Sequence, residues 1–121
     1  MKLWRPVGRN ELDKIEASGM REFPPRLPEQ PIFYPVLTFE YAEKIARDWN
    51  SVRQNHDHVG YVVAFEINDS YAARFPVQIA GGSECKELWV PADELGAFNK
   101  HIIGKIEVVA RYDKGKRVHS T

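Results

Sequence analysis

Cysteine is scarce in this chain, and neither sign of charge is in excess. Cys85 is the only cysteine among 121 residues, so no disulfide can form within the chain and the chain alone cannot close a cysteine-based zinc site. The 17 basic and 17 acidic residues cancel to a formal charge of zero. Nucleic-acid-binding proteins usually carry a basic excess, and we therefore do not expect a nucleic-acid partner.

Long apolar runs are also missing. No segment approaches the roughly 20 apolar residues that cross a bilayer. The first residues, MKLWRP, lack the apolar stretch of a secretory signal. A lone cysteine is typical of proteins kept in a reducing compartment. Together these absences predict a soluble, cytoplasmic protein that does not work at a membrane.

What the chain does contain is the composition of one globular domain, with 43% hydrophobic and 28% charged residues. Residues 2–7 read as a short strand. Asn10 is a plausible cap for a helix that ends near Gly19. Four of the nine residues from 23 to 31 are proline, which excludes a helix there and indicates a long, ordered loop.

The remainder of the chain alternates strands and short helices. Thr38 is a good N-cap for a helix whose apolar face is formed by Phe39, Ala42, Ile45, Ala46 and Trp49. Residues 60–67 are β-branched and aromatic and predict a central strand. Shorter strands are expected at residues 32–37, 76–80, 87–90 and 105–112, and a short helix at 92–99.

This order predicts an α+β fold rather than a doubly wound parallel sheet. We expect one compact domain over residues 1–112, with a twisted, mostly antiparallel sheet, two main helices and short helical inserts. Residues 113–121 are rich in charge and are expected to form a flexible C-terminal tail.

Several residues carry chemistry in other proteins but have an ordinary structural interpretation here. Two interpretations of His56 and His58 are open: they coordinate a metal ion, or they are solvent-exposed loop histidines. We favour the second interpretation and expect no metal. Cys85 is a nucleophile or an inert packing residue, and we favour packing. The Gly81-Gly82-Ser83 segment reads as a plain turn more readily than as a phosphate loop.

Arg5 and Glu87 are the more informative polar residues. Glu87 begins an otherwise apolar strand after a glycine turn, where a carboxylate stabilises a cationic transition state or simply charges an exposed strand edge. Arg5 shares a strand face with Leu3, and its planar guanidinium suits phosphate or carboxylate. Each residue taken alone favours the structural interpretation.

Taken together, several segments resemble a family of short bacterial proteins often labelled "ADP-ribosylation/crystallin". The resemblance lies in LWRPVG at 3–8, FPPRLP at 23–28, PIFYPVL at 31–37 and ELWVP at 87–91, with Tyr41-Ala42 and Ile45-Ala46 between them. That label evokes the ADP-ribosylglycohydrolases. Those are much larger helical enzymes with an acidic dimetal site, and this chain is too short and too strand-rich for their fold.

The layout resembles a minimal ADP-ribosyltransferase instead. Those enzymes hold NAD with an Arg or His on the first strand, frame the nicotinamide with a residue of the second strand or the following helix, and begin a late strand with a catalytic Glu. The resemblance implies NAD binding by Arg5 and by Tyr34 or Tyr41, and catalysis by Glu87. The Ser-Thr-Ser motif of one subgroup is missing, and Cys85 stands where another subgroup has Glu or Gln.

Two functions are therefore carried forward. The first is an ADP-ribosyltransferase-like, NAD-binding protein that transfers ADP-ribose to an unknown protein or small-molecule acceptor. The second is a non-catalytic module that binds a protein or ligand through Trp4, Trp49, Trp89 and the proline-rich loop. The two differ in whether Arg5 and Glu87 meet in one cleft.

Overall fold

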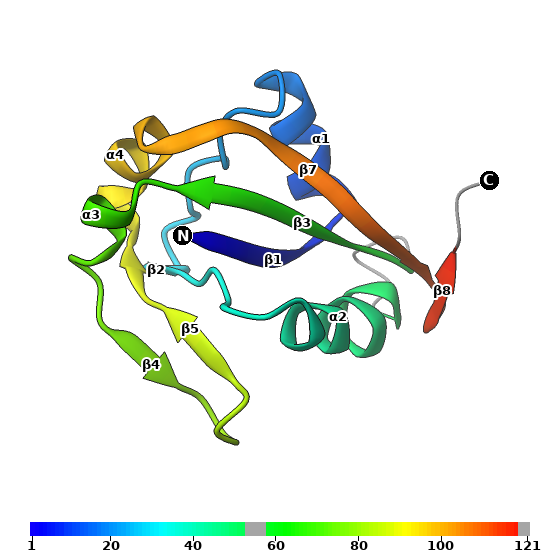
Figure 1. Ribbon diagram of the computed structural model, residues 1–121. Helices are drawn as coiled ribbons and strands as arrows, with labels where there is room; N and C mark the ends of the chain where they lie inside the picture. Colours follow the sequence, from blue (N-terminus) through cyan, green and yellow to red (C-terminus); the bar gives the residue numbers. More distant parts are fainter. Residues whose placement is uncertain (53–57, 119–121) are drawn as a thin grey trace.

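The architecture is centred on a four-stranded antiparallel sheet with strand order β1-β3-β7-β8 (Figure 1). The computed structural model describes residues 1–52 and 58–118. The strands are β1 (Lys2–Gly8), β3 (Val59–Ile67), β7 (Ile102–Asp113) and β8 (Lys116–Val118). β3 pairs with β1 on one side and β7 on the other, as expected for the central strand predicted from residues 60–67.

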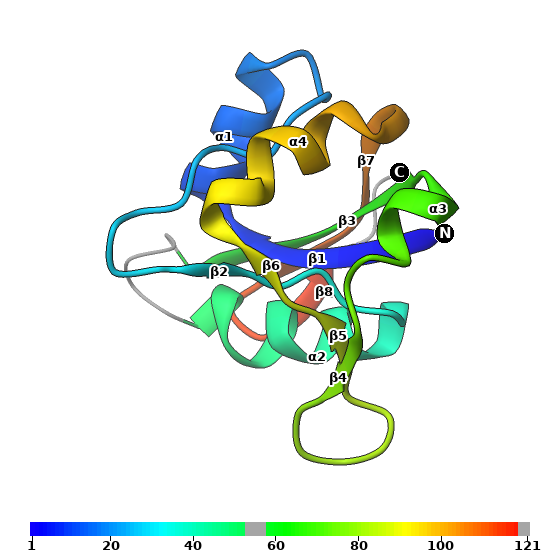
Figure 2. The same ribbon diagram turned by 90° about the vertical axis from the view of Figure 1, so that its left-hand side faces the viewer.

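Helices cover both faces of this sheet, which is why β3 is apolar almost throughout. In Figure 2, α1 (Arg9–Ala17) and α4 (Leu95–Lys100) lie on one side of the sheet and α2 (Phe39–Asp48) lies on the other. Val63 of β3 packs toward the first pair and Val62 packs toward α2. Successive residues of one strand therefore supply two cores.

The larger core is strongly aromatic. Phe23 of the proline-rich loop lies 4.9 Å, between ring centroids, from both Phe33 and Phe65. Phe98 of α4 contacts Phe33 at 5.6 Å and Phe65 at 6.0 Å. Tilted and edge-to-face pairs of this kind stabilise beyond their buried area. The loop is thus fixed to the body of the protein through Phe23.

The smaller core lies under α2. Ala42 and Ala46 are completely buried against Val62 and Tyr112 of the sheet. Small residues let the helix approach closely, and Gly60 marks the closest point. A Cβ added at Gly60 would lie 2.4 Å from the backbone oxygen of Ala46. The sequence gives this position to glycine because no side chain fits there.

Two small sheets extend the fold beyond the main one. β2 (Ile32–Phe33) pairs with β6 (Val90–Pro91), and β4 (Val77–Ile79) pairs with β5 (Lys86–Leu88) in a hairpin that projects from the body. Within the described residues, the remaining elements are α3 (Asp69–Ala72) and the short 3₁₀ helices η1 (Asn50–Val52) and η3 (Ala92–Glu94). Val36 links the sheets, since it bridges Trp4 of β1 and Glu87 of β5.

The α+β fold predicted from sequence is confirmed, as is the N-cap, because the Thr38 side chain accepts a hydrogen bond from the Tyr41 amide at 3.2 Å. The helix expected to follow an Asn10 cap begins two residues earlier than predicted, at Arg9, and its cap is Gly8, which forms no side-chain bond. The sequence predicts a charged, flexible tail from residue 113, and the structure adds a strand pair at its start. β7 continues to Asp113 and β8 pairs with it, so the boundary placed at residue 112 falls inside a hairpin.

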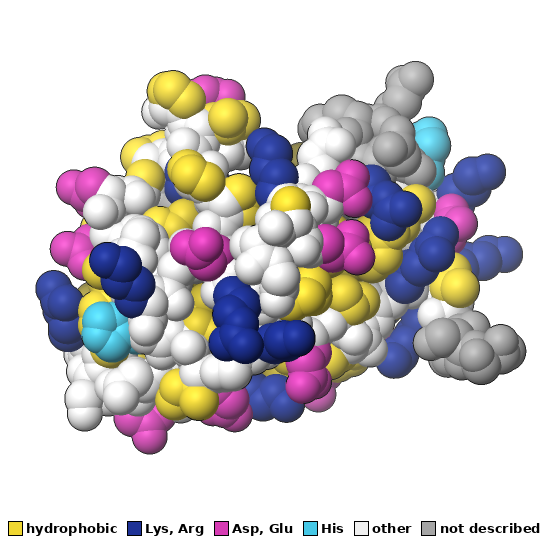
Figure 3. Space-filling model, turned by 90° about the horizontal axis from the view of Figure 1, so that it is seen from above, with side chains coloured by type: hydrophobic (Ala, Val, Ile, Leu, Met, Phe, Trp, Pro, Cys, Tyr) yellow, Lys and Arg dark blue, Asp and Glu magenta, His cyan; other side chains and the backbone are white. Residues whose placement is uncertain are grey.

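Acidic and basic side chains are interspersed over the face shown in Figure 3, in keeping with the balanced composition. Among the described residues, none of the helices has the length and apolar character needed to cross a bilayer.

Candidate functional site

A cleft of about 700 Å³ lies along β1, between α1 and α2. Ligand pockets usually measure about 300–1,000 Å³. The residues singled out from the sequence, Arg5, Tyr34, Tyr41 and Glu87, all line this cleft. They come from β1, the segment after β2, α2 and β5, so only the folded chain brings them together.

The cleft exists because β1 is paired along its whole length on one side only. On the other side, among the described residues, Trp4 alone forms a bridge, with hydrogen bonds of 3.0 and 2.8 Å to and from Val36. Beyond Trp4 the strand edge is open, and Arg5, Pro6, Val7 and Gly8 line the cleft. Pro6 has no N–H to leave unpaired at such an edge.

Arg5 is buried, with 8% of its surface exposed. Its Nε and Nη2 donate to the two carboxylate oxygens of Glu11 on α1, at 2.7 and 3.0 Å. Its Nη1 donates to the Tyr34 carbonyl at 3.2 Å, and its guanidinium lies 4.6 Å from the centroid of the Phe33 ring. A guanidinium has five N–H groups, so two remain for a ligand.

Glu87 is the other buried charge of the cleft, also 8% exposed. Its Oε2 accepts from the Tyr41 hydroxyl at 3.0 Å and its Oε1 accepts from the Trp89 indole nitrogen at 2.7 Å. The backbone on either side is fixed as well. The Leu37 amide donates to the Lys86 carbonyl, and the Leu88 amide donates to the Pro35 carbonyl. The carboxylate is thus held in one orientation.

The contact with Glu87 changes the ionisation of Tyr41. Burial and its hydrogen bond to the Glu87 carboxylate raise the pKa of Tyr41 to about 12. The hydroxyl therefore stays protonated at neutral pH and serves as a donor to Glu87. Thr38 sets its position, because the cap places Tyr41 in the first turn of α2, where the helix dipole also favours a nearby carboxylate.

Tyr34 connects the two charged ends of the cleft. Its carbonyl accepts from Arg5, while its ring packs edge-on against Trp89 with 6.1 Å between centroids. Trp89 in turn holds Glu87. A continuous chain of contacts therefore runs from Glu11 through Arg5, Tyr34 and Trp89 to Glu87.

The proline-rich loop forms the far wall of the cleft. Asn99 of α4 clamps its start, accepting from the Phe23 amide at 2.9 Å and donating to the Phe23 carbonyl at 3.0 Å. The Ala92 amide donates to the Pro31 carbonyl at its other end. Arg26 lies between these anchors, lines the cleft, and keeps its Nε buried without a hydrogen-bond partner among the described residues.

Arg5, Tyr34, Tyr41 and Glu87 were predicted as site residues, and Trp49 and Trp89 as residues of a binding surface, and all six line the cleft. The roles of Glu11 as the partner of Arg5, of Arg26, and of the Trp89 indole as a donor to Glu87 were not predicted. Arg26 stands inside a segment that the family resemblance already contained, and a lone arginine among prolines was the available signal. Nothing local to Glu11 indicates that α1 folds back onto Arg5.

The other candidate residues lie elsewhere. Cys85 is outside the lining of this cleft, and Gly81-Gly82-Ser83 forms the exposed turn between β4 and β5. His56 falls outside the described residues, while His58 precedes β3. Within residues 1–52 and 58–118, no three His, Cys, Asp or Glu side chains are grouped so that they could hold a metal ion.

Comparison of the chain with family models, with curated proteins and with solved structures finds no match.

Proposed function

We propose that this protein is an ADP-ribosyltransferase-like, NAD-binding protein that transfers ADP-ribose to an acceptor. The observation that carries the proposal is the convergence of Arg5, Tyr41 and Glu87 on one cleft. The sequence resemblance gave these residues separate roles in one reaction, and those roles require that the residues face one ligand.

The transfer reaction breaks the glycosidic bond between the nicotinamide nitrogen and C1′ of its ribose. Nicotinamide leaves with the bonding electron pair, the acceptor's nucleophilic atom forms a bond to C1′, and the acceptor loses a proton. Positive charge builds up on the ribose as the bond breaks. A fixed carboxylate stabilises such charge without reorganising, and Glu87 is fixed by two hydrogen bonds.

Glu87 also retains capacity for a ligand. An ionised carboxylate has about four lone-pair sites, and Tyr41 and Trp89 occupy two of them. The remaining sites can accept from ribose hydroxyls. Tyr34 and Tyr41 supply aromatic surface for a nicotinamide ring, and the exposed Trp89 lies beside Tyr34.

The direct test measures NAD binding by calorimetry and nicotinamide release by chromatography. We expect the purified protein to bind NAD and release nicotinamide, and Glu87→Gln to bind NAD while losing release by about a hundredfold or more. Glu84→Gln, on the exposed β4–β5 turn, is the matched control and should behave as the wild type. Absence of NAD binding by the wild-type protein would overturn the proposal.

A non-catalytic binding module remains the second candidate, favoured by apolar side chains at the cleft. Trp89 is 44% exposed, Trp49 is 52% exposed and Leu27 is 51% exposed, and exposed aromatic residues often anchor protein partners. The same experiments separate the two candidate functions. A non-catalytic module should not bind NAD in calorimetry, and Glu87→Gln should not change the amount of nicotinamide released.

A further inference from the structure

The two arginines of the cleft, Arg5 and Arg26, differ in how many hydrogen-bond partners they have. Arg5 is paired with Glu11 through two hydrogen bonds and also donates to the Tyr34 carbonyl. Arg26 forms no ion pair and no hydrogen bond within the described part of the chain, and its Nε is shielded from solvent. A buried donor left without an acceptor is energetically unfavourable.

The surroundings of Arg26 also favour an anion. Burial first, and then repulsion from the neighbouring Arg5, lower the pKa of Arg26, while Glu11 only partly offsets them. Glu11 is already committed to Arg5. A negative group placed beside Arg26 would therefore supply the missing acceptor and relieve the repulsion between the two guanidinium groups.

The loop backbone that carries Arg26 is held in place before any ligand binds. Phe23 is anchored by Asn99 on one side of it, and Pro31 is bonded to Ala92 on the other. Between them, the Gln30 amide donates to the Leu27 carbonyl at 2.8 Å in a tight turn. Prolines restrict the remaining backbone. A loop backbone fixed in this way loses little entropy when a ligand binds.

We propose that Arg26, on the proline-rich loop, is the main phosphate anchor of the cleft, and that the cleft takes a ligand with a phosphate or pyrophosphate group lying between Arg26 and Arg5. This inference rests on the proposed function, and it assigns the phosphate group to a residue that the sequence resemblance did not. Glu87, Tyr41 and Trp89 are then left for the sugar and base of the ligand.

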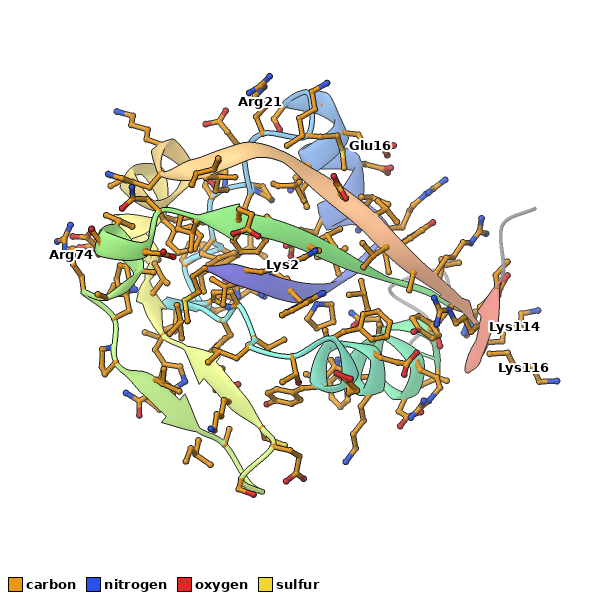
Figure 4. All side chains as sticks on the ribbon, viewed as in Figure 1. Lys2, Glu16, Arg21, Arg74, Lys114 and Lys116 are labelled. Atoms are coloured by element: carbon orange, nitrogen blue, oxygen red, sulfur yellow. The ribbon has the colours of Figure 1, made fainter. Side chains whose placement is uncertain are left out.

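The test compares wild type, Arg26→Ala, Arg26→Lys and Arg21→Ala in calorimetric titrations with NAD, ADP-ribose, inorganic pyrophosphate and nicotinamide riboside. Arg21 is the matched control, since it is exposed and lies beyond the end of α1 (Figure 4), outside the cleft lining. Arg26→Ala should weaken the binding of the three phosphate ligands by about tenfold or more and leave nicotinamide riboside unchanged. Arg26→Lys should fall in between, because it keeps the charge and loses the fork of donors.

Stability gives a second readout. Because Arg26 makes no hydrogen bond in the described structure, Arg26→Ala should melt at the wild-type temperature or above it. Unchanged NAD and pyrophosphate binding by Arg26→Ala would overturn the inference and leave the proposed function standing. Arg26-dependent binding of pyrophosphate without any NAD binding would support the anion site and overturn the proposed function. Failure of the wild type to bind any phosphate ligand would overturn both.

Discussion

Tyr41 and Glu87 are 46 positions apart in the chain and meet in a hydrogen bond of 3.0 Å between the Tyr41 hydroxyl and Glu87 Oε2. The bond joins the first turn of α2 to β5 across the floor of the cleft. It also ties the ionisation of a tyrosine to the position of the candidate catalytic carboxylate, which makes it measurable in solution.

The first prediction concerns alkaline pH. The pKa of Tyr41 rises from 10.0 to about 12 on folding, so between these values the unfolded chain loses the proton while the folded protein keeps it. Stability is therefore fully present below pH 10 and falls as the pH rises toward 12. Tyr41→Phe should flatten this decline in chemical denaturation measured at a series of pH values.

The decline should not vanish in Tyr41→Phe, because burial also raises the pKa values of Tyr71 and Tyr112. Tyr34→Phe is the control variant, because Tyr34 lines the same cleft but does not donate to Glu87. An identical alkaline slope in wild type and Tyr41→Phe would show that the bond to Glu87 does not form in solution.

The second prediction concerns the acidic partner of Arg5. Glu11→Gln removes the charge that faces a buried guanidinium, and should lower the free energy of unfolding by about 1–3 kcal/mol. It also frees Arg5 for a ligand, so pyrophosphate binding should tighten by about tenfold. Glu16→Gln, exposed on the same helix (Figure 4), should change neither quantity. Weaker pyrophosphate binding by Glu11→Gln would mean that Glu11 positions Arg5 rather than competing for it.

The third prediction tests the packing of α2 on the sheet. An added methyl at Gly60 meets the Ala46 carbonyl at 2.4 Å and the Asn50 Cβ at 2.8 Å. Gly60→Ala should therefore destabilise the protein by about 1–3 kcal/mol through overpacking. Gly96, in α4, has open space around its Cβ position, and Gly96→Ala should stabilise by about 0.5–1 kcal/mol. Thermal and urea unfolding measure both changes.

The fourth prediction uses the tryptophans as reporters. Trp49 and Trp89 line the cleft, whereas Trp4 packs with the small core under α2 and does not. NAD should therefore change the intrinsic fluorescence of the wild type, and Trp89→Phe should lose much of that change. Trp4→Phe should keep it. A response that disappears only in Trp4→Phe would place the ligand elsewhere.

The elements that sequence predicted best are those with strong local signals. The Thr38 cap and the buried positions Ala42 and Ala46 of α2 are both encoded within about a dozen residues, and the β-branched run of β3 needs no distant partner to be recognised. Trp49 was predicted on the same helix face, but it lies beyond the end of α2 and is 52% exposed. The hairpin of β7 and β8 was not predicted because β8 is only three residues long and its sequence is typical of a charged, exposed segment. Short strands of this kind form only when a neighbour supplies the hydrogen bonds.

The candidate site was predictable in part for the same reason. Arg5 stands out because it interrupts an apolar stretch, and Glu87 because it begins one. Strand alternation placed Arg5 on the face of Leu3, where its guanidinium lies over the Phe33 ring of the larger core. The partners of these two residues come from helices and loops whose packing no local pattern reveals. The bonds of Arg5 to Glu11 and of Glu87 to Tyr41 and Trp89 follow from tertiary structure alone.

The single bridge at Val36 has a mechanical consequence for the protein. Among the described residues, one ladder step joins β1 to Val36, which in turn bridges to Glu87, whereas β1 and β3 are paired over seven residues. The least reinforced seam of the fold therefore runs beside the candidate site. Parting it would break two backbone hydrogen bonds at Trp4 and the hydrogen bond from Arg5 to the Tyr34 carbonyl, and would pull Val36 out of the smaller core. The spacing between Arg5 and Glu87 therefore depends on side-chain packing more than on strand pairing.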